Sequence, residues 1–238
     1  MDPAILTFET AQAAAWACGA RILEILDKAR SERGTASLAL SGGHTPRPMF
    51  EWMAKRPFDW SAVQLFQVDE RCVPPDDGQS NFRMTRESLL DTAHIPESQF
   101  HRVKGELPPD EAAAVYIDDI RRHLHPGTGE LPVFDVIQRG MGPDAHTASL
   151  FPGEPLIGDR TGVAAAVWVE KFRQHRVTLL PGVLELARHT VCLATGGAKA
   201  DALVAVLRGP RDPLHVPSQI VSPDTCWYID KAAGAKLG

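Results

Sequence analysis

Three apolar runs of this chain end in a glycine-rich turn, and this pattern constrains the fold more than any other feature of the sequence. The runs span residues 37–40, 134–137 and 191–194. Each has the length and composition of a buried strand, and segments with helical periodicity lie between them. Strands separated by helices favour a parallel or mostly parallel sheet with helices on both faces. We therefore expect an α/β protein whose ligand binds beyond the carboxyl ends of its strands.

Other segments continue this alternation of strands and helices. The first expected helix places small or apolar residues on one face, namely Ala15, Cys18, Ile22, Ile25, Leu26 and Ala29. Further helices are expected at residues 82–90, beginning near Ser80, at 116–124 and at 198–207. The other expected strands span residues 4–8, 63–68, 163–169, 177–180 and 226–229. No linker divides the chain, so we expect a single domain over residues 1–238.

Charge and cysteine content narrow the possible partners. The 25 basic and 30 acidic residues give a formal charge of -5 without a long basic run, so nucleic acid is not an expected partner. The four cysteines are dispersed and form no CxxC pair, which favours a reduced, cytoplasmic protein. No apolar stretch has the length of a membrane span, so we expect no membrane association. An anionic substrate must then be held by a few local cations and backbone N–H groups.

The turn after residues 37–40 has the composition of an anion site. Ser41, Gly42 and Gly43 allow successive backbone N–H groups to face one ligand, and Thr45 adds a hydroxyl. The positive end of the following helix also favours phosphate. The turn matches neither the P-loop nor the dinucleotide-binding glycine motif, so it does not indicate nucleotide binding. An ordinary strand-to-helix turn is the alternative.

Cations occur at three further strand boundaries. Asp69, Glu70 and Arg71 follow an expected strand, where the acids can hold an arginine that clamps a phosphate or an oxyanion. A solvated strand end is the alternative interpretation of this triplet. Lys199 follows the third glycine turn and Arg176 opens an expected strand. Each offers a positive charge to phosphate, and an exposed surface cation is the alternative for both.

The loop after residues 134–137 combines an acid with a histidine. It reads GMGPDAHTASLFP over residues 140–152 and places Asp144 two residues before His146. A histidine with a near-neutral pKa can take a proton from water and return it to a leaving group, and Asp144 is expected to orient it. Residues 147–149 are expected to start a helix. The eight other histidines, including His123 and His125, are expected to be surface or capping groups.

Two other catalytic arrangements lack support in the sequence. A serine hydrolase is disfavoured because the chain has no GxSxG elbow and Ser41 has no evident partner. Metal catalysis lacks a ligand set, since the histidines show no HExxH or related spacing, and we expect no metal or cofactor. Water activation by a histidine, combined with phosphate recognition, is the remaining mechanism.

Five motifs occur in a fixed order: SGGHTP at residues 41–46, DERCVPPDDGQSN at 69–81, GMGPDAHTASLFP at 140–152, RVTL at 176–179 and GGAKADAL at 196–203. Together they resemble the 6-phosphogluconolactonase family over nearly the whole chain. The two glycine turns are shared with the related glucosamine-6-phosphate deaminases. The resemblance implies a Rossmann-like three-layer α/β/α fold. It also implies cofactor-free hydrolysis of 6-phosphogluconolactone to 6-phosphogluconate in the oxidative pentose phosphate pathway.

The resemblance also implies a division of roles among the residues above. His146 is the general base on water, Asp144 and Asp69 are orienting acids, and Glu70 is the less certain member of this set. Arg71 or the glycine-loop N–H groups would stabilise the tetrahedral oxyanion. The phosphate would be held by Ser41, Gly42, Gly43, Thr45, Arg71 and Lys199, with Arg176 as a weaker candidate.

Three positions depart from the family pattern. His44 stands where a second serine is common, and Leu180 where threonine is common. Ala145 replaces the glycine that usually precedes the histidine. If residue 145 requires a positive φ, alanine adds strain of about 1 kcal/mol.

Two alternative functions remain open. A glucosamine-6-phosphate deaminase also places acids and a histidine around a phosphorylated sugar, although the HTASLFP and DERCVP segments favour the lactonase. A noncatalytic sugar-phosphate sensor has a similar fold but should carry a DNA-binding or partner module. The expected partner is a small phosphorylated sugar lactone, and the protein is expected to be a monomer or a small homo-oligomer.

Overall fold

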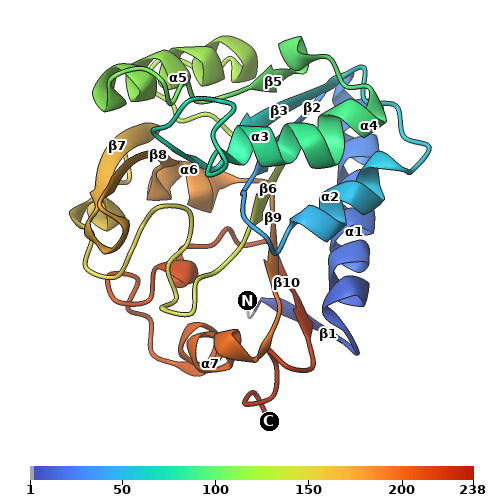
Figure 1. Cartoon of the computed structure of the whole chain (residues 1–238), viewed down its shortest axis with the longest axis vertical. Helices are drawn as coiled ribbons and strands as arrows, with labels where there is room; N and C mark the ends of the chain where they lie inside the picture. The colour runs from blue at the N-terminus through green and yellow to red at the C-terminus, as the bar shows by residue number, and fades with distance from the viewer. Residues whose placement is uncertain (1–2) are drawn as a thin grey trace.

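The computed structural model describes residues 3–238 and contains one parallel sheet and one smaller antiparallel sheet (Figure 1). The parallel sheet has seven strands in the order β1-β10-β9-β6-β2-β3-β5. The expectation of a mostly parallel α/β fold is thus confirmed. The strands are β1 (Ala4–Phe8), β2 (Ala36–Leu40), β3 (Val63–Gln67), β5 (Phe100–His101), β6 (Val136–Arg139), β9 (His189–Ala194) and β10 (Thr225–Asp230).

The central strands are rich in apolar residues because both faces of the sheet are covered, although β6 ends in the buried polar residues Gln138 and Arg139. Every residue of β2 and β6 is buried. In β9, Val191 and Leu193 face one core, while Cys192 and Ala194 face the other, as the two-residue period of a strand requires. Burial on both faces therefore explains why these strands show no alternation of polar and apolar residues.

Helices cover the two faces of the parallel sheet (Figure 1). One face packs against α1 (Ala11–Arg33) and α2 (Arg47–Ala54), together with α3 (Asn81–Thr85), a π-helical turn at Arg86–Leu90 and α4 (Asp91–Ala93). The other face packs against α5 (Pro109–Leu124), α6 (Pro181–Leu186) and α7 (Ala200–Arg208). None of these helices has the length and apolarity needed to cross a bilayer.

The sequence signals for helix ends are confirmed at several positions. All six residues expected on the inner face of the first helix are buried in α1. Ser80 caps α3, since its Oγ accepts a hydrogen bond from the N–H of Arg83. His125 ends α5 with a φ of 45°, and its N–H donates to the carbonyl of Arg121, so the prediction of a capping group holds for this histidine.

A second sheet, which the sequence pattern does not reveal, lies beside the helices of the second face. It contains β4 (Asp69–Arg71), β8 (Gln174–Leu179) and β7 (Ala164–Val169), and its pairings are antiparallel. Only a short turn joins β7 to β8, so they form a hairpin and take no part in the parallel sheet. The register of β4 and β8 pairs Asp69 with Thr178 and Arg71 with Arg176.

The strand order brings the motif loops together. Strands β9, β6, β2 and β3 are consecutive neighbours and run in parallel. The loops at residues 195–197, 140–146 and 41–43, and the start of β4, therefore meet at one edge of the sheet. Ligands of open α/β sheets bind at such an edge.

Candidate active site

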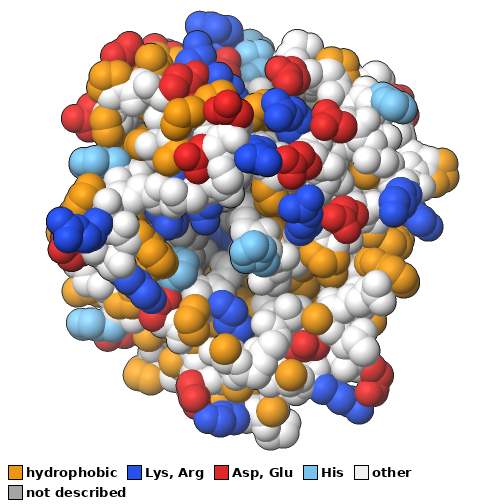
Figure 2. All heavy atoms as spheres, viewed as in Figure 1, with side chains coloured by type: hydrophobic (Ala, Val, Ile, Leu, Met, Phe, Trp, Pro, Cys, Tyr) orange, Lys and Arg blue, Asp and Glu red, His pale blue; other side chains and the backbone are white. Residues whose placement is uncertain are grey.

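Nine of the residues predicted from the sequence line one cleft of about 200 Å³ at this edge. Figure 2 shows the hollow in the middle of the face, with basic and histidine side chains beside it. Asp144 does not line the cleft but contacts His146, which does. Glu70 does not line the cleft either. The nine lining residues are Ser41, Gly42, Gly43, Thr45, Asp69, Arg71, His146, Arg176 and Lys199.

His146 is held by two residues of its own loop, and the hairpin of β7 and β8 holds one of them. Its Nδ1 lies 2.5 Å from Oδ1 of Asp144, and its ring stacks on Phe151 with the centroids 4.1 Å apart. The other carboxylate oxygen of Asp144 accepts a hydrogen bond of 2.8 Å from Nζ of Lys171, in the turn between β7 and β8. When Nδ1–H donates its hydrogen bond to Asp144, the Nε2 of the neutral imidazole is the free, basic nitrogen.

The electrostatic surroundings keep His146 neutral and Asp144 ionised near pH 7. Burial lowers the pKa of His146 below its usual value, although the hydrogen bond and charge of Asp144 oppose this effect. Burial opposes ionisation of Asp144, but hydrogen bonds from Lys171 and His146 outweigh it and hold the pKa of the carboxyl well below its usual range. The pair is therefore an imidazole base oriented by a carboxylate.

The backbone of the histidine loop depends on its small residues. A Cβ atom on Gly142 would lie 2.0 Å from Nδ1 of His146 and 2.4 Å from Oδ1 of Asp144, so only glycine fits. Ala145 has a φ of 60°, which realises the strained case considered above. Ala148 has a φ of 52°, and residues 147 and 150 form an isolated bridge. The expectation of a helix starting at residues 147–149 is wrong, because this left-handed residue turns the chain.

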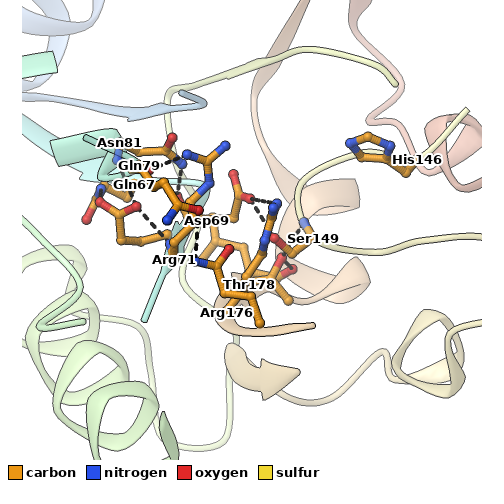
Figure 3. Close-up of polar contacts among 12 residues, drawn as sticks. Gln67, Asp69, Arg71, Gln79, Asn81, His146, Ser149, Arg176 and Thr178 are labelled. Atoms are coloured by element: carbon orange, nitrogen blue, oxygen red, sulfur yellow. Dashed lines mark hydrogen bonds and ion pairs between the residues drawn. The ribbon is translucent and has the colours of Figure 1, made fainter. Parts of the chain in front are cut away.

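Asp69 belongs to a network on the second sheet rather than to the histidine. Its Oδ2 accepts a hydrogen bond of 2.6 Å from Oγ of Ser149 and lies 4.0 Å from Nη1 of Arg176. The backbone N–H of Ser149 donates to Oγ1 of Thr178, which is the residue paired with Asp69 in the sheet. Figure 3 shows this cluster with His146 apart from it. Asp69 makes no hydrogen bond to His146 within residues 3–238; it bonds Ser149 and lies beside Arg176, and its negative charge raises the pKa of His146.

Glu70 points away from the cleft and organises the loop over residues 72–80. Its carboxylate accepts hydrogen bonds from three backbone N–H groups and two side chains. The expectation of an acid that orients the histidine is therefore wrong for Glu70, which instead fixes the loop beside Arg71. The donors are the N–H groups of Arg71, Asn81 and Phe82, Nε2 of Gln67 and Oγ of Ser80.

Several buried polar atoms at the cleft have no hydrogen-bond partner within residues 3–238. They belong to four residues that line it, Ser41 (Oγ), Asn81 (Oδ1), Arg71 (Nε) and Arg176 (Nε). Buried polar groups in folded proteins are nearly always paired, because an unpaired one is costly. Their concentration at one cleft marks a surface adapted to a polar ligand.

The three cations of the cleft come from different elements. Arg71 stands on β4 and donates to the carbonyl of Gln79, while Arg176 stands on β8 over the ring of Phe172, with its Cζ 4.9 Å from the ring centroid. Lys199 follows β9, and burial lowers the pKa of its ammonium from the usual value. The cleft thus presents two guanidinium groups and an ammonium to one ligand, which suits a phosphate.

Sequence reasoning missed three residues of this site. Asn81 and Ser149 stand inside quoted motifs, at the end of DERCVPPDDGQSN and within HTASLFP, but their types gave no separate reason to select them. Lys171 lies outside every motif. It reaches Asp144 only because the hairpin folds over the histidine loop, so no local signal could have found it.

Comparison with known proteins agrees with this geometry. The profile of the family described as glucosamine-6-phosphate isomerases/6-phosphogluconolactonase matches residues 9–228. A 6-phosphogluconolactonase of Synechocystis is 35% identical, with 89% of each chain covered. One of Treponema pallidum is 36% identical, with 95% of this chain and 90% of the relative covered.

Solved structures show the same relationship. A 6-phosphogluconolactonase from Trypanosoma cruzi superposes with a TM-score of 0.88 at 26% identity, covering 100% of this chain and 98% of the other. A monomeric glucosamine-6-phosphate deaminase shares the fold, with a TM-score of 0.83 at 14% identity over 98% of this chain and 99% of the other. On the family match and the identity to its relatives, this chain belongs to the glucosamine-6-phosphate isomerase/6-phosphogluconolactonase family.

Proposed function

We propose that this protein hydrolyses 6-phosphogluconolactone to 6-phosphogluconate. The observation that carries the proposal is the Asp144–His146 pair, whose basic nitrogen is free, in a cleft that also holds three cations. The relatives with 35% and 36% identity bear the name of this activity. The deaminase shares only the fold at 14% identity, so the comparison favours the lactonase.

The cations and the glycine turn suit the phosphate of the substrate. Arg176 and Lys199 supply positive charge, and the turn at residues 41–43 supplies the N–H groups of its two glycines and the unpaired Oγ of Ser41. The N–H of Ser41 itself donates to Gln138. Thr45 adds a hydroxyl at the start of α2. Binding of the phosphate would hold the lactone carbonyl at a fixed position relative to His146.

His146 then acts on water. Nε2 takes a proton from water as the oxygen attacks the lactone carbonyl, and a tetrahedral oxyanion forms. Arg71 or the N–H groups of the glycine loops stabilise this oxyanion. The intermediate collapses by breaking the bond to the ring oxygen, which receives the proton from Nε2. Asp144 remains ionised and stabilises the imidazolium that exists between the two transfers.

The reaction class is tested by supplying the two substrates of the family to the same preparation. We expect acid release from freshly generated 6-phosphogluconolactone above the spontaneous rate, and no ammonia from glucosamine 6-phosphate. Ammonia release without lactone hydrolysis would replace the proposal with the deaminase reaction. Binding of 6-phosphogluconate without turnover of either substrate would identify a sugar-phosphate sensor.

A further inference from the structure

A second cluster of ionisable side chains lies where β5 meets α5, outside the lining of the cleft. His101 ends β5 and is buried, with 6% of its surface exposed, so the prediction of a surface or capping group is wrong for this histidine. Its Nδ1 lies 3.0 Å from Oδ2 of Asp119 on α5. His123, one helical turn beyond Asp119, places its Nδ1 3.3 Å from Oδ1 of the same carboxylate. The two imidazole rings lie side by side, with centroids 3.8 Å apart.

These three side chains have the composition of a site for a transition-metal ion. One ligand atom from each lies within 4.8 Å of the others, and no other group of three such residues approaches this closely in the part of the chain that is described. Ligands at about 2.0–2.1 Å from a tetrahedral zinc ion lie about 3.4 Å apart. The two histidine–aspartate separations are close to this value. His123 has 31% of its side chain exposed and therefore has room to adjust.

Nδ1 of His123 also lies 2.9 Å from the backbone oxygen of Asp119, and it would exchange this contact for the ion. An outer contact holds the imidazole ring of His101, whose Nε2 lies 2.8 Å from Oε1 of Gln64. Histidines that bind metals typically donate their second ring N–H to such an oxygen, which fixes the tautomer. With the proton on Nε2, the Nδ1 lone pair of His101 faces the carboxylate of Asp119. In this tautomer the lone pair of His101 and the carboxylate of Asp119 repel each other, and a bound cation would remove the repulsion by accepting both as ligands.

The surroundings also suit a cation that keeps part of its water shell. His101 forms the buried wall, while Asp119 and His123 have side chains that are 27% and 31% exposed, so one side of the cluster is open to solvent. The cluster lies near the carboxyl end of α5, where the helix dipole favours positive charge. Two nitrogens and one oxygen suit zinc and related ions rather than calcium or magnesium.

We propose that His101, Asp119 and His123 bind one divalent transition-metal ion of the zinc class, with solvent completing the coordination. The sequence shows no such motif because its ligands come from two elements, and only Asp119 and His123 have helical spacing. The ion would join the short edge strand β5 to α5. It should therefore stabilise the fold without taking part in lactone hydrolysis.

The test uses the full-length protein after treatment with a chelator, in a buffer without phosphate. We expect calorimetric titration with Zn²⁺ to show one saturable site, and Co²⁺ to give the visible absorption of a coordinated ion at the same stoichiometry. His123→Ala and Asp119→Asn should each weaken zinc binding at least tenfold. His215→Ala is the matched control, because His215 is also paired with an aspartate, Asp212, at 2.7 Å but lies outside the cluster.

Two further readouts separate this site from the cleft. His146→Ala should retain the zinc site, and His123→Ala should retain lactone hydrolysis. Wild-type protein that binds no zinc below millimolar concentration would overturn the proposal and identify a plain hydrogen bond from His101 to Asp119. Equal affinity of wild type, His123→Ala and Asp119→Asn would overturn it as well. Asp119→Asn preserves the side-chain shape, so the test stands even if His123→Ala folds poorly.

Discussion

At the scale of single residues, the behaviour of His146 follows from the charges around it. Burial lowers its pKa, Asp144 raises it, and the positive charge of Lys199 lowers it further. A lowered pKa keeps the imidazole neutral, and therefore basic, over a wider range of pH. Activity that needs the neutral form is complete above this pKa and falls as the pH drops through it.

Replacement of Lys199 should change both the affinity and the pH dependence. In Lys199→Met, loss of a phosphate contact should raise KM roughly tenfold or more, as expected for the loss of a charged hydrogen bond. Loss of the nearby positive charge should also raise the pKa of His146, so the acid limb of kcat/KM should move to higher pH. The measurement is a pH profile corrected for spontaneous lactone opening. An unchanged KM and an unmoved limb would contradict the role of Lys199.

Ala145 stores backbone strain, because its φ of 60° is costly for a residue with a Cβ atom. We expect Ala145→Gly to raise the free energy of unfolding by about 0.5–1 kcal/mol, since relief of strain exceeds the added entropy of the unfolded chain. Urea unfolding measures the change. Ala205→Gly, inside α7, is the control and should lower stability by about 1 kcal/mol. Loss of stability in both variants would show that Ala145 is not strained.

Residue types thus predicted most of the cleft but not every role within it. Nine residues selected from the sequence line the cleft, because glycines, cations and a histidine at the ends of expected strands can be recognised in the sequence itself. It assigned Asp69 and Glu70 to the histidine, whereas hydrogen bonds direct one to Ser149 and the other to the loop over residues 72–80. The direction of a side chain depends on hydrogen-bond partners that can be distant in the sequence, so closeness in sequence does not determine it.

At the scale of elements, the histidine loop can hold His146 against Asp144 because Gly142 leaves room for both side chains. A Cβ atom at position 142 would overlap the imidazole of His146. We expect Gly142→Ala to reduce kcat on lactone by about 10²-fold or more, since misplacement of a base by about 1 Å has costs of that order.

The control for this substitution is Gly158→Ala, where a Cβ atom meets no other atom within 4 Å. It should leave kcat unchanged. Circular dichroism should show folded protein for both variants. Full activity of Gly142→Ala would mean that His146 does not need its present position.

The sequence pattern predicted the strands of the antiparallel hairpin but not their pairing. The segments of β7 and β8 were both identified as strands, but the composition of an apolar run does not predict which strand it pairs with. Strand β5 was missed because its two residues are too few to show any period. The unpredicted pairing of β7 with β8 places Arg176 and Lys171 at the cleft, and the unpredicted strand β5 places His101 at the second cluster.

At the scale of the whole molecule, the order of the parallel strands assembles the site. The segments that carry Ser41, His146 and Lys199 are far apart in the chain, and the adjacency of β2, β6 and β9 brings them to one edge. Alternation of strands and helices predicted this fold class, and the rule that loops meet at the carboxyl ends predicted the edge. The order of the strands could not be predicted from any local segment, because it depends on how the helices and strands pack against one another.

The central claim is that His146 activates water for attack on a phosphorylated lactone. Its most direct test is the rate of acid release from 6-phosphogluconolactone by wild type, His146→Ala and the control His215→Ala, each corrected for spontaneous opening. We predict that His146→Ala lowers kcat by about 10²–10⁴-fold with little change in affinity for 6-phosphogluconate, while His215→Ala matches wild type. Undiminished hydrolysis by folded His146→Ala protein would contradict the claim.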